Sequence, residues 1–327
     1  MRESDSGMCS AIRSEALVRQ YGELTAVDGV DLDVAAGEIY GFLGPNGAGK
    51  STTVRMLCTL LGPTSGSATV AGYDVVDDPG AVRLRIGVAL QEAALDPRQT
   101  GAELLRLQGL LYGLPRSEAN RRVGELGELI DLADALKRPI STYSGGMRRR
   151  LDLAAALVHD PQILFLDEPT TGLDPVSRAR VWEEVRRLNT DLGTTIFLTT
   201  QYLEEADALA DRVGIIDAGR IVAEGTPAEL KRSIGTDVII ARLDRDAAQV
   251  REMIERVPGV LSVEARGSEL IVATTDGSAT VSPVAVALSA CEVAVRDLTL
   301  RTPTLDDVFL ELTGSRIQHD DEEGVDQ

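Results

Sequence analysis

The sequence has little of the material from which disulfide frameworks and zinc sites are built. It holds three cysteines, Cys9, Cys58 and Cys291, with no C-x-x-C pair, and two histidines, His159 and His319. Disulfide-stapled domains and structural zinc sites need clusters of these residues, so both are excluded. This cysteine usage suits a reducing cytosol.

Long apolar runs are also missing. No stretch reaches the roughly 18 apolar residues that a membrane-spanning helix requires, and the runs at 163–166 and 194–200 have the length of buried strands. The N-terminal residues mix acids, bases and serines where a signal peptide would carry an apolar core. We therefore expect a chain that neither spans a membrane nor is exported.

Positive charge is scarce. The chain has 33 Lys and Arg against 52 Asp and Glu, a formal charge of −19, which argues against broad attraction to nucleic acid or to anionic lipid. With 327 residues and 43% hydrophobic content, it can bury one large core and a smaller one, which excludes a disordered or fibrous protein.

Two domains are predicted between polar tails at 1–13 and 315–327, which we expect to be flexible and disordered. Residues 14–232 alternate short apolar strands with helical segments and glycine-rich turns, the pattern of an α/β domain with a largely parallel sheet. The segment DLDVAAGEIYGFLG, residues 31–44, reads as one strand. Helical spacing replaces the strand signal over about 92–160, which predicts a helical subdomain.

Residues 233–314 restart the pattern as strand, helix, strand, strand, helix, strand, the order of a small ferredoxin-like α+β domain. Gly267 and Ser268 form the expected turn between its middle strands. A last short helix is expected to begin at Thr304 and to end before Gly314.

A glycine-rich loop, GFLGPNGAGKST, separates an apolar strand from a helical stretch and fits the phosphate-loop pattern in its required context. Its glycines let backbone N–H groups turn toward a polyphosphate, Lys50 reaches the terminal phosphates, and the Ser51 hydroxyl can ligate Mg²⁺. A chance glycine-rich turn would have to match the glycines, the Lys-Ser pair and both flanks at once. The predicted ATP-binding residues of this loop are Gly44, Pro45, Asn46, Gly47, Ala48, Gly49, Lys50, Ser51 and Thr52.

Two acids follow an apolar strand far downstream, in PQILFLDEP. Strand ends are where ligands bind in open α/β sheets. Asp167 is placed to hold Mg²⁺ directly or through water, and Glu168 to polarise the water that attacks the γ-phosphate. A solvated acidic turn is the alternative, but Mg-ATP needs a carboxylate opposite its serine ligand.

The segment YSGGM lies just upstream of that strand. Ser144, Gly145 and Gly146 put a hydroxyl and two bare amides at a helix N-terminus, which forms an anion site. The motif resembles the signature motif of ABC-transporter ATP-binding subunits. The resemblance implies a head-to-tail homodimer, in which the phosphate loop of one subunit and the signature of the other enclose each ATP. The alternative is an ordinary capped helix with arginines 148–150 on its solvent face.

Three more residues match this family by position. The resemblance implies that Tyr21 stacks on adenine, that Gln91 touches Mg²⁺ or the attacking water, and that Asp174, in TTGLDP, bridges the subunits. In isolation they would be a half-buried aromatic, a lone polar residue and a common turn.

One position departs from the family. Where a histidine usually contacts the γ-phosphate, this sequence has Gln201. Glutamine keeps an amide donor but cannot hold a charge near neutrality, so a histidine-dependent proton relay does not transfer to this chain. Glu168 then carries more of the catalysis, and Gln201 is expected to orient phosphate or water by hydrogen bonding.

The sequel YLEEAD after Gln201, the segment YSGGMRRRLDLA and a C-terminal domain ending in LDDVFLELTG together resemble the daunorubicin-resistance type of drug-exporter ATP-binding subunit over residues 14–314. The resemblance implies an ATP hydrolase on the cytoplasmic face of the membrane. It would bind a separate integral-membrane permease and drive efflux of a hydrophobic, anthracycline-like antibiotic.

Other functions stay open at this point. An ABC exporter for a lipid or another natural product fits the same motifs. A non-transport ABC ATPase in translation or DNA repair would be expected to show tandem cassettes or coiled-coil inserts, and the charge of −19 argues against nucleic acid as a partner. A phosphate-loop kinase or GTPase would leave Ser144, Gly145 and Gly146 without a role.

Overall fold

Two of the predicted apolar segments form the centre of a six-stranded sheet. β7 (Ile163–Asp167) and β8 (Thr195–Thr200) are buried at every position, the pattern of a parallel sheet covered on both faces. The strand order is β10-β9-β3-β8-β7-β6, parallel from β9 to β6, which confirms the predicted α/β class. The other strands are β3 (Ile39–Leu43), β6 (Ile86–Ala89), β9 (Arg212–Asp217) and the antiparallel edge strand β10 (Arg220–Gly225).

The computed structural model describes residues 10–90, 95–291 and 293–314. The chain divides into two compact units between Pro227 and Ala228. Within the described ranges, no helix combines the length and the apolar character that crossing a bilayer demands.

The first unit has a second, antiparallel sheet that the sequence analysis did not predict. Its order is β2-β1-β4-β5, and its strands are β1 (Ser10–Tyr21), β2 (Leu24–Ala35), β4 (Ser65–Val70) and β5 (Tyr73–Asp74). The prediction of a single strand over 31–44 is wrong. The chain turns between Ala35 and Ile39, and Gly37 at φ +79° supplies the left-handed conformation of that turn.

The predicted N-terminal tail is too long by four residues, because β1 begins at Ser10. Ile12 is fully buried and pairs with Val34 of β2 and Val70 of β4. Burial of the Ile12 side chain and pairing with two strands stabilise this segment as a strand, although its neighbours in sequence are polar. The predicted C-terminal tail, 315–327, lies outside the described residues.

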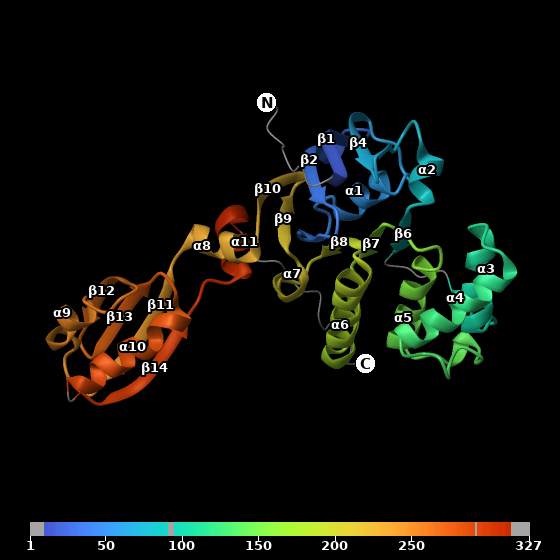
Figure 1. Cartoon of the computed structure of the whole chain (residues 1–327). Coiled ribbons are helices and arrows are strands. Elements are labelled where there is room, and N and C mark those ends of the chain that lie inside the picture. Colours follow the sequence, from blue (N-terminus) through green and yellow to red (C-terminus); the bar gives the residue numbers. More distant parts are fainter. Residues whose placement is uncertain (1–9, 91–94, 292, 315–327) are drawn as a thin grey trace, which may run out of the picture. The chain divides into compact units, whose positions relative to one another are not determined.

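Helices cover both faces of the six-stranded sheet (Figure 1). α1 (Lys50–Leu57) lies between the two sheets, where it contacts β2, β4 and β7. Its apolar side chains join a core that includes the ring cluster of Phe42, Phe165 and Phe197. On the other face, a second core unites the sheet with α5 (Gly145–Ala156) and α6 (Pro175–Leu192). The first unit also contains α2 (Pro79–Arg83), α7 (Leu203–Leu209) and a helical subdomain.

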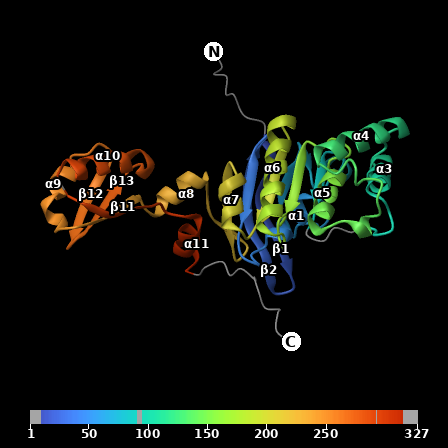
Figure 2. The ribbon, with the colours of Figure 1, turned by 90° about the horizontal axis from the view of Figure 1, so that it is seen from below.

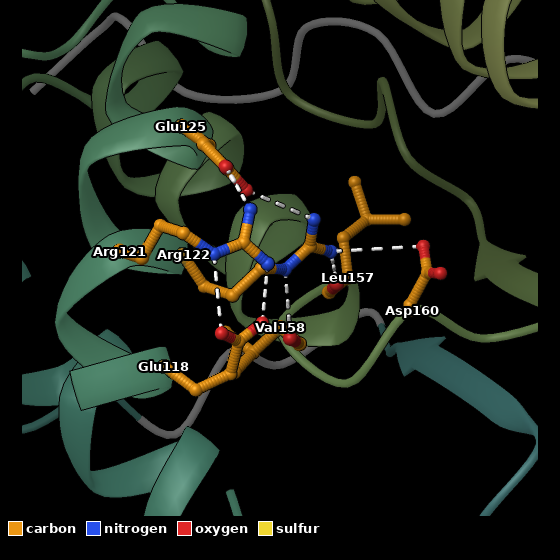
Figure 3. Close-up of polar contacts among 7 residues, drawn as sticks. All are labelled: Glu118, Arg121, Arg122, Glu125, Leu157, Val158 and Asp160. Atoms are coloured by element: carbon orange, nitrogen blue, oxygen red, sulfur yellow. Dashed lines mark hydrogen bonds and ion pairs between the residues drawn. The ribbon is translucent and has the colours of Figure 1, made fainter. Parts of the chain in front are cut away.

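The helical subdomain contains α3 (Gly101–Leu111), α4 (Arg116–Leu129) and α5. Thr100 and Glu103 form a capping box that starts α3. Arg122 of α4 reaches across to the end of α5, where its Nη2 donates to the Leu157 carbonyl at 2.8 Å and its Nε to the Val158 carbonyl at 3.2 Å (Figure 3). These charge-assisted bonds tie α5 to α4.

The second unit has the predicted ferredoxin-like order. Its antiparallel sheet runs β12-β13-β11-β14, with α9 and α10 packed on one face (Figure 2). Gly267, at φ +60°, lies in the turn between the middle strands, and Thr304 caps the last helix, which Gly314 ends in a left-handed conformation. The elements are α8 (Pro227–Ile234), β11 (Asp237–Leu243), α9 (Arg251–Ile254), β12 (Val260–Arg266), β13 (Glu269–Thr274), α10 (Gly277–Ala290), β14 (Val295–Arg301) and α11 (Leu305–Thr313).

Candidate functional site

Three neighbouring strands bring predicted site residues to one edge of the six-stranded sheet. β3 leads into the phosphate loop at Gly44, β7 ends at Asp167, and β8 is followed by Gln201. Because β8 lies between β3 and β7 and all three are parallel, their carboxyl ends meet at the same edge. This is the edge at which ligands bind in open α/β sheets.

The phosphate loop wraps so tightly that side chains would block it. Gly49 caps α1 at φ +107°, and a Cβ there would lie 2.4 Å from the Ala26 carbonyl oxygen. A Cβ on Gly44 would lie 2.3 Å from the Ile216 carbonyl oxygen. The loop encloses a cavity of about 360 Å³, lined by Ala26, Asn46, Gly47, Gly49, Lys50, Ser51, Thr52 and Glu168.

Lys50 is the first residue of α1 and is only 4% exposed. Its Nζ donates to the carbonyls of Gly44 at 2.7 Å and Pro45 at 3.0 Å, and lies 3.3 Å from Glu168 Oε1. Burial lowers the pKa of Lys50, while the negative charges of Glu168 and Asp167 oppose that shift. The amine is thus fixed between the loop and Glu168.

Asp167 is held by hydroxyl groups from two other elements. Thr199 Oγ1 donates to Asp167 Oδ1 at 2.5 Å, and Ser51 Oγ donates to the same oxygen at 3.2 Å. All three side chains lie at the carboxyl edge of the sheet. The structure therefore joins the predicted serine and aspartate although they are far apart in sequence.

Glu168 has an unusual backbone. Its φ of +49° is in the left-handed region, which costs a non-glycine residue about 1 kcal/mol or more. Its N–H donates to both the carbonyl oxygen and the Oγ1 of Thr199, at 3.1 Å each, and Thr171 Oγ1 lies 3.3 Å from Glu168 Oε2. These contacts hold the carboxylate over the cavity that it helps to line.

The donor set at this edge fits a magnesium ion. Ser51 and Asp167 supply a hydroxyl and a carboxylate oxygen, the hard ligands that Mg²⁺ prefers. Among the described residues, no group of three or more His, Cys, Asp and Glu could hold a metal. A site with two protein oxygens suits an ion that completes its shell with phosphate and water.

Two of the predicted site residues cap helices that begin close to each other. Ser144 caps α5 by accepting the Met147 N–H at 3.2 Å, and Asp174 caps α6. Hydrogen bonds from the hydroxyl and N–H of Ser177 lower the pKa of Asp174. A Cβ on Gly146 would lie 3.5 Å from Ser177 Oγ, so the signature and the Asp174 turn are neighbours.

The remaining predicted residues differ in what the structure shows. Tyr21 ends β1 with 45% of its surface exposed, and the guanidinium of Arg19 lies 4.6 Å from its ring centroid. Gln201 is buried, and among the described residues its Oε1 has no hydrogen-bond partner. Gln91 lies outside the described residues.

Sequence reasoning missed three buried groups around this site: Thr199, Arg149 and Glu205. The TT pair that ends the apolar run 194–200 was a signal for Thr199, because polar residues at a strand end point to a site. The arginines of α5 do not share a solvent face. Arg148 is exposed, whereas the side chains of Arg149 and Arg150 are 13% and 12% exposed and reach carbonyls of other elements.

Comparison with known families covers both units. The ABC transporter family model matches residues 27–171, and the C-terminal domain of DrrA1-3-like ATP-binding proteins matches residues 225–313.

Curated relatives match nearly the whole chain. The daunorubicin resistance ATP-binding protein DrrA3 of Streptomyces coeruleorubidus is 50% identical over 307 residues, covering 93% of this chain and 96% of the relative. The daunorubicin/doxorubicin resistance ATP-binding protein DrrA of Streptomyces peucetius is 49% identical, covering 93% and 92%. The linearmycin resistance ATP-binding protein LnrL of Bacillus subtilis is 36% identical, covering 94% and 99%.

Solved structures match about two thirds of the chain. The ATP-binding subunit of an ABC transporter shares 29% identity at a TM-score of 0.62, covering 68% of this chain and 93% of that one. The dimeric structure of the bacterial ABC transporter cassette MJ0796 shares 25% identity at a TM-score of 0.60, covering 66% and 98%. The chain therefore belongs to the ABC family of ATP-binding, ATP-hydrolysing transporter subunits, and within it to the DrrA type with its own C-terminal domain.

Proposed function

We propose that this chain powers the export of a hydrophobic antibiotic of the anthracycline class by hydrolysing ATP. The observation that carries the ATPase part is the cavity lined by Lys50, Ser51 and Glu168, with Asp167 hydrogen-bonded to Ser51 beside it. The substrate class rests on the roughly 50% identity to daunorubicin resistance proteins along both units.

In this proposal the phosphate loop binds the β- and γ-phosphates. Backbone N–H groups of residues 44–52 and the amine of Lys50 neutralise phosphate charge. Ser51 and Asp167 hold Mg²⁺, which supplies Lewis-acid polarisation of the phosphoryl oxygens. Thr199 orients Asp167 by donating to Oδ1, which leaves the second carboxylate oxygen for metal or water.

Glu168 is the proposed general base. Its carboxylate lines the cavity and accepts the proton of the attacking water, and the amine of Lys50 lies 3.3 Å from its Oε1. Gln201 follows the strand beside β7, and its unpartnered Oε1 is available to orient that water.

The signature would act on a second copy of the chain. Apart from its own helical turn, no described residue comes within 4 Å of the position that a Cβ on Gly145 would occupy, which leaves room for a phosphate to approach its backbone. We propose a head-to-tail homodimer, in which Ser144, Gly145 and Gly146 of one copy close the ATP site of the other. Tyr21 is proposed to stack on adenine, Gln91 to approach the metal, and Asp174 to bridge the copies.

The transport role requires a partner. We propose a separate integral-membrane permease, which would hold the chain at the cytoplasmic face of the membrane. Residues 10–227 would then be the ATP-binding domain and residues 228–314 an accessory domain, which moves the boundary expected near residue 233.

The first experiment is Mg-ATPase activity of the purified chain against its concentration, beside Glu168→Gln and the exposed control Glu204→Gln. We expect wild-type activity to rise more steeply than linearly, and Glu168→Gln to be inactive but dimeric on size exclusion with ATP. Constant activity per monomer, together with a monomeric Glu168→Gln, would contradict the shared site.

A second candidate substrate class is supported by LnrL, a linearmycin resistance protein with 36% identity over the same two units. Such a chain would drive export of a different natural product or a lipid. Co-expression with a permease in a drug-sensitive host separates the two: lower anthracycline accumulation supports the first proposal, and unchanged accumulation with resistance to another compound supports the second.

A further inference from the structure

Arg149 joins two segments that carry predicted site residues. It lies on α5, the helix that begins with the signature, and its side chain is 13% exposed. Nη1 donates to the Leu90 carbonyl at 2.8 Å, Nε to the Pro169 carbonyl at 2.9 Å, and Nη2 to the Asp167 carbonyl at 3.3 Å. One guanidinium thus binds the ends of two neighbouring strands.

Two of these three carbonyls belong to the residues that flank Glu168. Asp167 and Pro169 are the residues on either side of Glu168, and Leu90 directly follows β6, the neighbour of β7. Glu168 has a left-handed backbone that does not persist without surrounding support. Fixing the carbonyls of both neighbours of Glu168 restricts the conformation of the backbone segment that contains it.

A buried carboxylate supports the same loop from another helix. Glu205 of α7 is fully buried, and its Oε1 accepts hydrogen bonds at 2.9 Å from Thr170 Oγ1 and from Trp182 Nε1 of α6. The loop from Asp167 to Thr170 is therefore bound to α5 through Arg149 and to α6 and α7 through Glu205.

α5 is in turn fixed at its far end. Arg122 binds the carbonyls that follow the last turn of α5, as described above (Figure 3). A displacement of α4 and α5 is thus carried to the loop by charge-assisted hydrogen bonds.

We propose that Arg149 is a positioning residue for Glu168, which couples the signature helix to the catalytic loop. The inference rests on the proposed function, because it gives Glu168 the role of general base. When the signature of one copy binds nucleotide on the other, α5 holds Glu168 of its own copy in the reactive position. Arg149 itself touches no substrate.

The test uses a side chain that keeps the charge but loses the geometry of the guanidinium. In Arg149→Lys a single ammonium group replaces three nitrogens spread over a plane, so it cannot reach all three carbonyls at once. The matched control is Arg150→Lys. Arg150 is on the same helix and equally buried, and it donates to the Ile130 and Asp131 carbonyls, away from the catalytic loop.

We expect Arg149→Lys to lower kcat by about ten- to a hundredfold, the cost of a misplaced catalytic group. KM for Mg-ATP should stay within about twofold, since the phosphate loop is untouched. In a Glu168→Gln background, the ATP-dependent dimer should still form. Arg150→Lys should leave kcat within about threefold of wild type. Both variants are assayed at the same interval below their own thermal unfolding midpoints, so that a difference in stability does not enter the comparison.

A double-mutant cycle separates positioning from a general structural role. If Arg149 acts through Glu168, adding Arg149→Lys to Glu168→Gln changes the residual single-turnover rate by less than about twofold. An equal loss in both backgrounds, or an equal loss in Arg150→Lys, overturns the inference. Should Arg149→Lys fail to fold, Arg149→Gln carries the same comparison.

The inference and the proposed function fail differently. A wild-type chain that does not hydrolyse ATP at any concentration contradicts the proposed function. A wild-type chain that hydrolyses ATP while Arg149→Lys keeps full kcat contradicts only the role of Arg149.

Discussion

Ser51 Oγ donates a hydrogen bond to Asp167 Oδ1 across 3.2 Å, joining residues that are 116 positions apart. The contact exists because β3 and β7 are both parallel neighbours of β8, so that the loop after β3 and the end of β7 meet. Ser51 and Asp167 are the two residues proposed to hold the metal, so their proximity is the basis for the first prediction.

Ser51→Ala is expected to raise the Mg²⁺ concentration for half-maximal ATPase activity by at least about tenfold, because the ion loses one of two protein ligands. The fold should persist, since Asp167 keeps its bond from Thr199. ATPase rates across a Mg²⁺ titration at fixed ATP measure the effect. A titration curve that superimposes on wild type would show that the serine does not hold the metal.

Gln201→Ala is expected to lower kcat by about tenfold through loss of a group that orients water or phosphate. Gln201→His should retain more activity than alanine, because imidazole restores a donor. The control is Gln162→Ala, an exposed glutamine at the opposite end of β7. An ATPase rate unchanged in Gln201→Ala refutes this role.

Glu205→Ala is expected to lower the free energy of unfolding by about 2–4 kcal/mol, because it leaves the Trp182 Nε1 and Thr170 hydroxyl donors buried without an acceptor. Glu205→Gln keeps an acceptor oxygen and should cost less. Trp182 is the single tryptophan of the chain. Its fluorescence during urea unfolding therefore measures the loss of structure around the Glu205 contact itself. Equal stability of the alanine and glutamine variants would contradict this account.

Glu184 predicts a pH dependence of stability. Burial raises its pKa to about 7, against partial compensation by Arg150. A carboxyl group with a raised folded pKa binds protons more tightly when folded, so its contribution to stability is lost as pH rises from about 4.5 through 7. Glu184→Gln should therefore gain stability over wild type as pH rises from 5 to 8, by up to about 2 kcal/mol.

The control for that prediction is Glu204→Gln, an exposed glutamate on α7. Its difference from wild type should stay flat across the same pH range. The test is the thermal unfolding midpoint of each protein at pH 5, 6, 7 and 8. If the midpoints of Glu184→Gln and wild type change with pH in parallel, Glu184 does not titrate in this range.

The parallel strands and the phosphate loop could be predicted because their signals are local. β7 and β8 contain the apolar runs ILFL and IFL, and the residues of the phosphate loop are contiguous. β4, with the sequence SGSATV, and the half-exposed β10 could not, since small or polar residues on one solvated face give no strong strand pattern. Their place in the sheets is set by partners distant in sequence.

The helix N-terminus at Ser144 could also be predicted, because its side chain acts on a residue three positions away. The role of Arg149 could not. Three consecutive arginines suggest a solvated face, and only the fold places one of them against carbonyls near residues 90 and 168. Contacts of this kind depend on how helices cross, which no local pattern encodes.

The left-handed backbone of Glu168 has a consequence for which sequences this position accepts. Glycine is the residue that a φ of +49° favours, so Glu168→Gly is expected to fold about as stably as wild type or better, while losing all turnover. Selection for stability alone would therefore favour glycine at this position. A chain that keeps glutamate at this conformation trades stability for chemistry, and relatives with another residue at this position are expected to bind ATP without consuming it.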